Sequence, residues 1–175
     1  MNIREQLAKE ISRENWNSIG AKIGKEQALF KELMKAFFSA DRTIVLSASQ
    51  VMGDLGEKYP ELLKPYRSKL IQYLKTNPAD AVRRSTMRIF QIVDIPETDE
   101  GDLFDLGIGY LKSSNEPIAV KAFSMTVLRR ICEKYPELAS EVIPQIEILV
   151  EENASAGLVN RGEKELKKLR KIQNL

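Results

Sequence analysis

The hexapeptide EKYPEL at residues 57–62 occurs a second time, unchanged, at residues 133–138. The second copy is offset from the first by 133 − 57 = 76, which is twice 38, and a degraded copy, VDIPE at 93–97, lies between them. An internal repeat at a spacing of this size is typical of chains built from stacked supersecondary units. The sequence therefore predicts a repeat protein with a unit of about 38 residues.

The segment that precedes each copy also repeats, and its apolar spacing is helical. Val82, Thr86, Ile89 and Val93 follow one another at steps of four, three and four, which places them on one face of a helix. No segment shows the sustained alternation of a strand. The same stripe recurs one repeat unit earlier and one repeat unit later, as Ile44, Ala48, Val51 and Leu55 and as Val120, Ser124, Val127 and Ile131.

A further copy fits the tail of the chain when one residue is inserted, so that Val159 takes the place of Val120. An N-terminal helical segment is expected at about 2–23, followed by about four helix pairs, so the predicted fold class is all-α. The first helices of the pairs are expected near 25–39, 61–76, 99–113 and 137–152, and the second helices near 41–58, 79–94, 116–135 and 155–172.

Two of the expected second helices carry a pattern of a Pro/Asn/Asp turn, then Val, then Arg or Lys: NPADAVRRSTMRIF at 77–90 and SNEPIAVKAFSMTVL at 114–128. The pattern resembles the second helix of repeats in the HEAT/armadillo superfamily, and the chain is similar to short bacterial HEAT-like proteins. The other two copies depart from it, with Val45 and Asn160 where Arg83 and Lys121 stand.

The resemblance implies an α-α superhelix, a HEAT-like solenoid in which the second helices line the concave wall. It implies a single HEAT-like domain over residues 1–175, with an N-terminal cap at 1–24. The repeats are then expected at about 25–58, 59–94, 95–135 and 136–175.

The composition excludes several functional classes. The chain of 175 residues is 43% hydrophobic and 30% charged, which is typical of a globular protein. It contains no His, so catalytic triads, Cys/His dyads and His-ligated zinc sites are excluded. The single cysteine, Cys132, allows no internal disulfide and fits a reducing compartment.

No targeting, membrane or cofactor motif is present. The first 15 residues carry charges throughout, unlike a signal peptide, and no apolar run approaches the ~18 residues of a membrane span. The acidic cluster DEGDLFD at 99–105 lacks the ligand spacing of an EF-hand loop. The sequence therefore predicts a cytoplasmic protein without a cofactor, a metal or an enzyme activity, and with no membrane partner.

Charge is distributed unevenly along the chain, although the formal net charge is only +2. The tail at 153–175 is strongly basic, whereas the first-helix segments at 97–113 and 136–152 are strongly acidic. Several bases of the second helices fall off the apolar stripe, and on a concave wall they would attract an acidic peptide, a phosphorylated segment or nucleic acid. These candidate binding residues are Arg84, Arg88, Arg129, Arg130, Arg161, Lys164 and Lys168.

The leading hypothesis is a non-catalytic protein-interaction module that binds an acidic or phosphorylated partner on this basic face. One alternative is nucleic-acid binding, because HEAT-like alkylpurine DNA glycosylases use a basic concave face, although the second helices here carry few aromatic residues. The other alternative is that the seven bases are solvated or pair with neighbouring helices. Two further side chains are expected to be structural: Trp16 as an anchor of the N-terminal segment, and Cys132 as a half-buried thiol.

Overall fold

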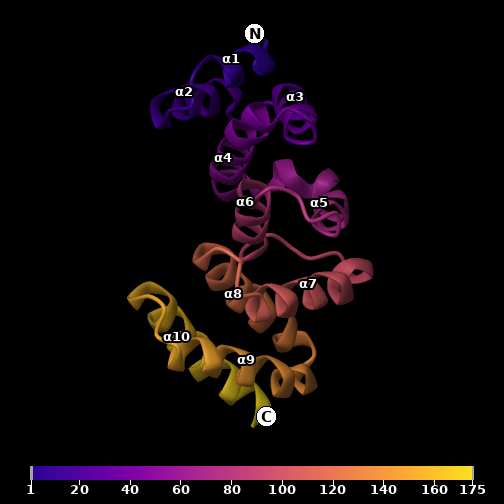
Figure 1. Cartoon of the computed structure of the whole chain (residues 1–175). Helices are drawn as coiled ribbons and strands as arrows, with labels where there is room; N and C mark the ends of the chain where they lie inside the picture. Colours follow the sequence, from indigo (N-terminus) through magenta and orange to yellow (C-terminus); the bar gives the residue numbers. More distant parts are fainter. Residues whose placement is uncertain (1, 175) are drawn as a thin grey trace. The chain divides into compact units, whose positions relative to one another are not determined.

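The structure is a computed structural model that describes residues 2–174. Over this range the chain forms ten α-helices and three 3-10 helices and contains no strand, so the predicted all-α, HEAT-like fold class is confirmed. The helices belong to two compact units, Met1–Asp94 and Ile95–Leu175, whose elements are labelled in Figure 1. Each unit contains two helix pairs, and the boundary between the units coincides with a predicted repeat boundary.

The first unit begins with a broken helical segment and continues with two helix pairs. A single helical segment was expected at 2–23, but it is broken into two helices. The Ser12 hydroxyl caps the start of the second helix by accepting a hydrogen bond from the N–H of Asn15 at 3.2 Å. Helix α4 packs against both α3 and α6. The elements are α1 (Ile3–Lys9), α2 (Arg13–Ile23), α3 (Gln27–Phe37), α4 (Arg42–Lys58), η1 (Pro60–Tyr66), α5 (Arg67–Leu74) and α6 (Asp80–Phe90).

The second unit repeats this arrangement of pairs. Helix α7 packs against α8, helix α9 packs against α10, and the second helices α8 and α10 are themselves neighbours. The second helices are therefore adjacent within each unit, as α4 and α6 are in the first. The elements are η2 (Glu97–Asp99), α7 (Glu100–Lys112), α8 (Ile118–Lys134), η3 (Pro136–Leu138), α9 (Ala139–Glu151) and α10 (Ala156–Gln173).

The 38-residue register holds through all four second helices. Their N-cap residues follow one another at a spacing of one repeat unit: Asp41, Ala79, Pro117 and Ser155. The three apolar stripes predicted from the sequence are buried throughout, and every one of their residues is at most 4% exposed. Burial of one stripe per repeat gives the pairs a continuous core within each unit.

The prediction of an inserted residue in the tail is wrong. Leu158, which is 1% exposed, takes the place of Val120, whereas Val159 is partly exposed. No residue is inserted before α10, because Ser155 caps this helix one repeat unit after Pro117, and its hydroxyl accepts the N–H of Leu158 at 3.2 Å. Val159, and not Asn160, therefore stands at the repeat position of Arg83.

A glycine and two asparagines make the tight packing of the pairs possible. Gly162 lies where a Cβ atom would come within 2.5 Å of Val150 Cγ2, so α10 can approach α9 only without a side chain there. Asn77 and Asn153, at equivalent positions two repeat units apart, turn the chain between the helices of a pair with φ of 52° and 49°. Asparagine tolerates this left-handed conformation better than most residues, which explains its recurrence.

Candidate functional site

The two predicted binding residues of the first unit hold its second helices together. On α6, Arg84 Nη2 donates to Gln50 Oε1 of α4 at 2.7 Å. Arg88 donates from Nη1 to Asp54 Oδ1 at 3.0 Å and from Nε to Glu57 Oε1 at 2.7 Å. The hydrogen bond to Glu57 is the main cause that raises the pKa of Arg88. Both guanidinium groups are therefore engaged with α4.

In the second unit, a buried carboxylate organises two of the predicted binding residues. Glu165 of α10 is 4% exposed and accepts hydrogen bonds from Arg129 Nε at 2.7 Å and from Thr126 Oγ1 at 2.9 Å. Arg161 Nη1 in turn donates to Thr126 Oγ1 at 2.8 Å, and Arg129 also pairs with Glu133. These contacts join α8 to α10 in the way that the Arg84 and Arg88 contacts join α4 to α6.

Glu165 is an exception to the repeat pattern. Its position in the apolar stripe is occupied by Val51, Ile89 and Val127 in the other three copies. A carboxylate is tolerated in a core position only when it is paired and hydrogen-bonded, and Arg129 provides that pairing here. This role of Glu165 was not predicted from the sequence, although a Glu at a stripe position was the available signal.

Lys164 and Lys168 are the predicted binding residues that remain exposed and unpaired within residues 2–174. Arg130 is half-buried and has interactions of its own. Lys167 and Lys171 are also exposed, and the four lysines follow one another at i, i+3, i+4 and i+7 on one face of α10. We call Lys164, Lys167, Lys168 and Lys171 the α10 lysine row. Only Lys164 and Lys168 were predicted from the sequence, although the helical spacing could have identified all four.

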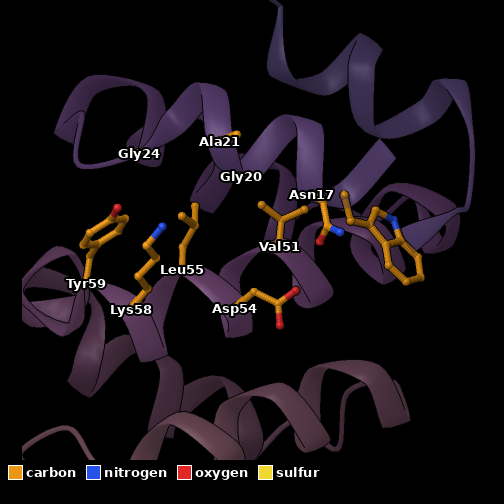
Figure 2. Close-up of a pocket in the computed structure, with 10 residues that line it drawn as sticks. Asn17, Gly20, Ala21, Gly24, Val51, Asp54, Leu55, Lys58 and Tyr59 are labelled. Carbon is orange, nitrogen blue, oxygen red and sulfur yellow. The ribbon is translucent and has the colours of Figure 1, made fainter. Parts of the chain in front are cut away.

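A groove of about 370 Å³ lies between α2 and the C-terminal half of α4 (Figure 2). Val51, Asp54 and Leu55 line it along α4, and Lys58 and Tyr59 of the first EKYPEL copy stand at one end, as Figure 2 shows. Opposite them the groove is lined by α2 and the turn after it, through Trp16, Asn17, Gly20, Ala21 and Gly24. We call this feature the α2–α4 groove.

The cationic end of the α2–α4 groove surrounds an aromatic ring. Lys25 Nζ and Lys58 Nζ each lie 5.2 Å from the ring centroid of Tyr59, within the range of a cation–π contact. Neither ammonium group forms a salt bridge with a carboxylate of the described residues. The groove therefore combines apolar side chains with two ammonium groups at one end, and its lining carboxylate, Asp54, is paired with Arg13 and Arg88.

A second pocket of about 300 Å³, in the second unit, is lined by Tyr135 and Leu138 of the other EKYPEL copy. There Lys134 Nζ donates to Glu97 Oε1 at 2.9 Å and to Glu100 Oε1 at 3.0 Å, and the hydroxyl of Tyr135 donates to Glu100 Oε2 at 2.7 Å. The hydrogen bond from Lys134 lowers the pKa of Glu97, and the hydrogen bond to Glu100 raises the pKa of Tyr135. In this copy the Lys-Tyr pair binds two carboxylates.

The two remaining predictions from the sequence concern Trp16 and Cys132. Ile19 and Ile23, each 1% exposed, anchor α2, whereas Trp16 is only half-buried and lines the α2–α4 groove. Cys132 is more buried than expected, at 0% exposed, and its burial raises the pKa of the thiol to about 11. A thiolate is the reactive form, so we expect this cysteine to react slowly in the folded chain.

No group of His, Cys, Asp or Glu within residues 2–174 is arranged to bind a metal ion. The described helices include none that is both long and apolar enough to cross a membrane. A family model described as a HEAT repeat domain matches residues 3–169. Neither the curated proteins nor the solved structures contain a match to the chain.

Proposed function

Because the chain belongs to the HEAT repeat family, whose repeats generally mediate protein–protein interactions and are typically non-catalytic scaffolds, we propose that it is a non-catalytic interaction module. Its partner in this proposal is an acidic or phosphorylated segment of another protein. The observation that carries the proposal is the α10 lysine row, which presents four exposed ammonium groups without a partner among the described residues.

The repeat register supports α10 as the binding element. Lys164 and Lys168 occupy the repeat positions of Arg88 and Arg130, which are two of the bases predicted to face a partner. In the earlier copies Arg88 is engaged with acids of the chain itself. Arg84, Arg88, Arg129 and Arg161 make contacts within the chain, and Arg130 has interactions of its own. The proposed binding face is therefore narrowed from seven bases to the α10 lysine row.

The spacing of the α10 lysine row favours an anionic partner. Seven residues of helix span about 10 Å, which is about one Debye length at physiological salt, so the fields of the four charges add. Like charges at these spacings also repel one another, by roughly 0.2–0.5 kcal/mol per pair. A bound carboxylate or phosphate relieves that repulsion as well as making new contacts.

Two points of the same proposal concern the chain as a whole. Residues 1–175 act as a single HEAT-like domain, which is supported by the 38-residue register that continues from one unit to the other. The protein works in the cytoplasm, which is supported by a single cysteine, Cys132, that is buried and makes no disulfide.

The test compares a peptide with a nucleic acid as ligands of the α10 lysine row. The probes are a fluorescent poly-glutamate peptide and a fluorescent single-stranded DNA, each titrated with the full chain by anisotropy at several salt concentrations. The double variant Lys164→Glu/Lys168→Glu is expected to weaken peptide binding at least about tenfold, or ~1.4 kcal/mol. The matched control is Lys31→Glu/Lys64→Glu, which makes the same charge change at two exposed lysines of the first unit.

Each possible outcome distinguishes between the hypotheses. The proposal requires peptide binding that the control variant retains and the double variant loses. Equal loss in both variants would mean that only net charge matters, and the row would have no special role. Binding of DNA alone, with a steep dependence on salt, would replace the proposal with the nucleic-acid alternative.

A further inference from the structure

The two EKYPEL copies lie at equivalent ends of α4 and α8, two repeat units apart, but the residues around them differ. Glu97 and Glu100 lie two repeat units after Ala21 and Gly24 in the sequence, so these residues occupy equivalent repeat positions. The same shift of two repeat units brings the α7–α8 pair onto α3–α4, since α8 (Ile118–Lys134) corresponds in length and register to α4 (Arg42–Lys58). Both Ala21 and Gly24 line the α2–α4 groove, just as Glu97 and Glu100 line the pocket of the second unit.

The second unit therefore shows what the Lys-Tyr pair of this motif binds. Lys134 reaches both glutamates, at 2.9 and 3.0 Å, and the Tyr135 hydroxyl donates to Glu100 at 2.7 Å. The two carboxylates are three residues apart at the start of a helix, so that a single short segment presents both of them. The motif is thus a receptor for two carboxylates, already filled by the chain itself in this unit.

In the first unit the same receptor has no internal carboxylate. Ala21 and Gly24 have no group that could reach Lys58, and Lys58 pairs with no described acid. Lys25 stands at the position of Gly101 and adds a second cation, 5.2 Å from the ring centroid of Tyr59. Both ammonium groups therefore place positive charge beside the Tyr59 ring, and a bound carboxylate would offset that charge.

The floor of the groove adds an apolar contact to this charge. Val51 and Leu55 lie next to Lys58 along α4, as Figure 2 shows, and Trp16 lines the same groove. The Nε1 atom of Trp16 is buried and has no hydrogen-bond partner in the described part of the chain. A ligand of this groove therefore needs an apolar side chain close to its acidic groups, a combination that a protein segment provides and a simple anion does not.

We propose that the α2–α4 groove is a docking site for an acidic segment of a partner protein, with two carboxylates three residues apart, as in Glu97 and Glu100, and an apolar side chain beside them. Lys58, Lys25 and the Tyr59 hydroxyl bind the carboxylates, and Val51 and Leu55 contact the apolar side chain. This site lies in the first unit and is independent of the α10 lysine row in the second.

The chain supplies its own probe for this site. The synthetic peptide IPETDEGDLFDL, residues 95–106, carries both glutamates in their native spacing, and Trp16 is the only tryptophan of the protein. The peptide is titrated into the full chain, and binding is followed by the fluorescence of Trp16. We expect a saturable change that weakens with added salt, and no change with a peptide in which Glu97 and Glu100 are replaced by Gln.

Two variants test the groove from opposite directions. Lys58→Glu is expected to weaken peptide binding at least about tenfold, whereas Lys31→Glu, the same charge change at another exposed lysine, leaves it unchanged. Ala21→Glu places a carboxylate at the position of Glu97, and is expected to occupy Lys58, raise the melting temperature and block the peptide. Ala21 is exposed on α2, so this variant folds even if Lys58→Glu does not.

The results overturn the proposal in three cases: the wild-type chain shows no saturable change, the Gln peptide binds equally well, or Ala21→Glu binds the peptide like the wild type. The Lys164→Glu/Lys168→Glu variant is expected to give the wild-type titration. If that variant alone loses the peptide, the acidic segment binds the α10 lysine row and not the groove. Failure of this proposal and failure of the proposed function are therefore distinguishable.

Discussion

Replacing Arg129 by Met removes the partner of the buried carboxylate of Glu165. The side chains of Arg129 and Glu165 are only 12% and 5% exposed, and their Nε and Oε2 atoms are 2.7 Å apart. Met retains much of the length and apolar volume of the arginine side chain but provides no charge. In the variant, Glu165 keeps only the hydroxyl of Thr126 as a donor among its present partners.

The expected loss of stability is large because the remaining charge stays buried. Breaking a buried ion pair by removal of one partner typically costs about 3–5 kcal/mol, against a total stability of about 5–15 kcal/mol for a domain. Arg88→Met is the natural comparison, since its partners Asp54 and Glu57 are 28% and 40% exposed. Those acids can be hydrated after the change, so we expect a cost of only about 0–1 kcal/mol.

A double variant separates the cost of the unpaired charge from the loss of packing. Arg129→Met/Glu165→Val places at position 165 the residue type found at the equivalent stripe positions Val51 and Val127. Replacement of a buried ion pair by apolar residues of similar volume is often neutral or stabilising. We therefore expect the double variant to regain most of the stability that Arg129→Met loses.

The assay is urea unfolding followed by far-UV circular dichroism, with free energies obtained by linear extrapolation and compared at an unchanged slope. Two results would refute the reasoning. One is that Arg129→Met costs no more than Arg88→Met. The other is that the double variant is as unstable as Arg129→Met, which would mean that the lost stability comes from packing and not from the buried charge.

Three further predictions follow from other parts of the structure. Ile89→Ala removes a side chain that is 0% exposed and should cost about 2–5 kcal/mol in chemical denaturation; a cost near the surface level of ~0.5 kcal/mol would contradict the burial of the stripe. Cys132, buried and with a pKa of about 11, should resist a disulfide reagent at pH 8 until the chain is unfolded, and rapid labelling of the folded protein would contradict this. The hydrogen bond from Lys134 lowers the pKa of Glu97. The stability that this pair provides is therefore present above pH 4.5, the ordinary glutamate pKa, and is lost as the pH falls through the lower pKa of the folded state. Lys134→Gln should flatten the acid side of a plot of melting temperature against pH, and an unchanged slope would count against the pairing.

The sequence by itself determined the helices and their buried faces, because both depend on local spacing. The steps of four, three and four residues in Val82–Val93 can be buried together only on a helix, and the 38-residue repeat carries the same face through the other copies. The predicted second helices near 41–58, 79–94, 116–135 and 155–172 accordingly lie close to the observed α4, α6, α8 and α10. The break after α1 was not anticipated, because a capping serine acts through one local hydrogen bond that apolar periodicity does not reveal.

Only the tertiary structure decided which charges are free. Arg88 and Arg129 look alike in the sequence, as bases beside an apolar stripe, but their partners on neighbouring helices, Asp54, Glu57 and Glu165, lie 31 to 36 residues away. Lys58 and Lys134 stand in identical hexapeptides, yet Lys134 pairs with Glu97 of η2 and Glu100 of α7, whereas Lys58 pairs with no described acid. A charge is compensated by whatever the fold brings within a few ångströms, and spacing along the chain does not determine that distance.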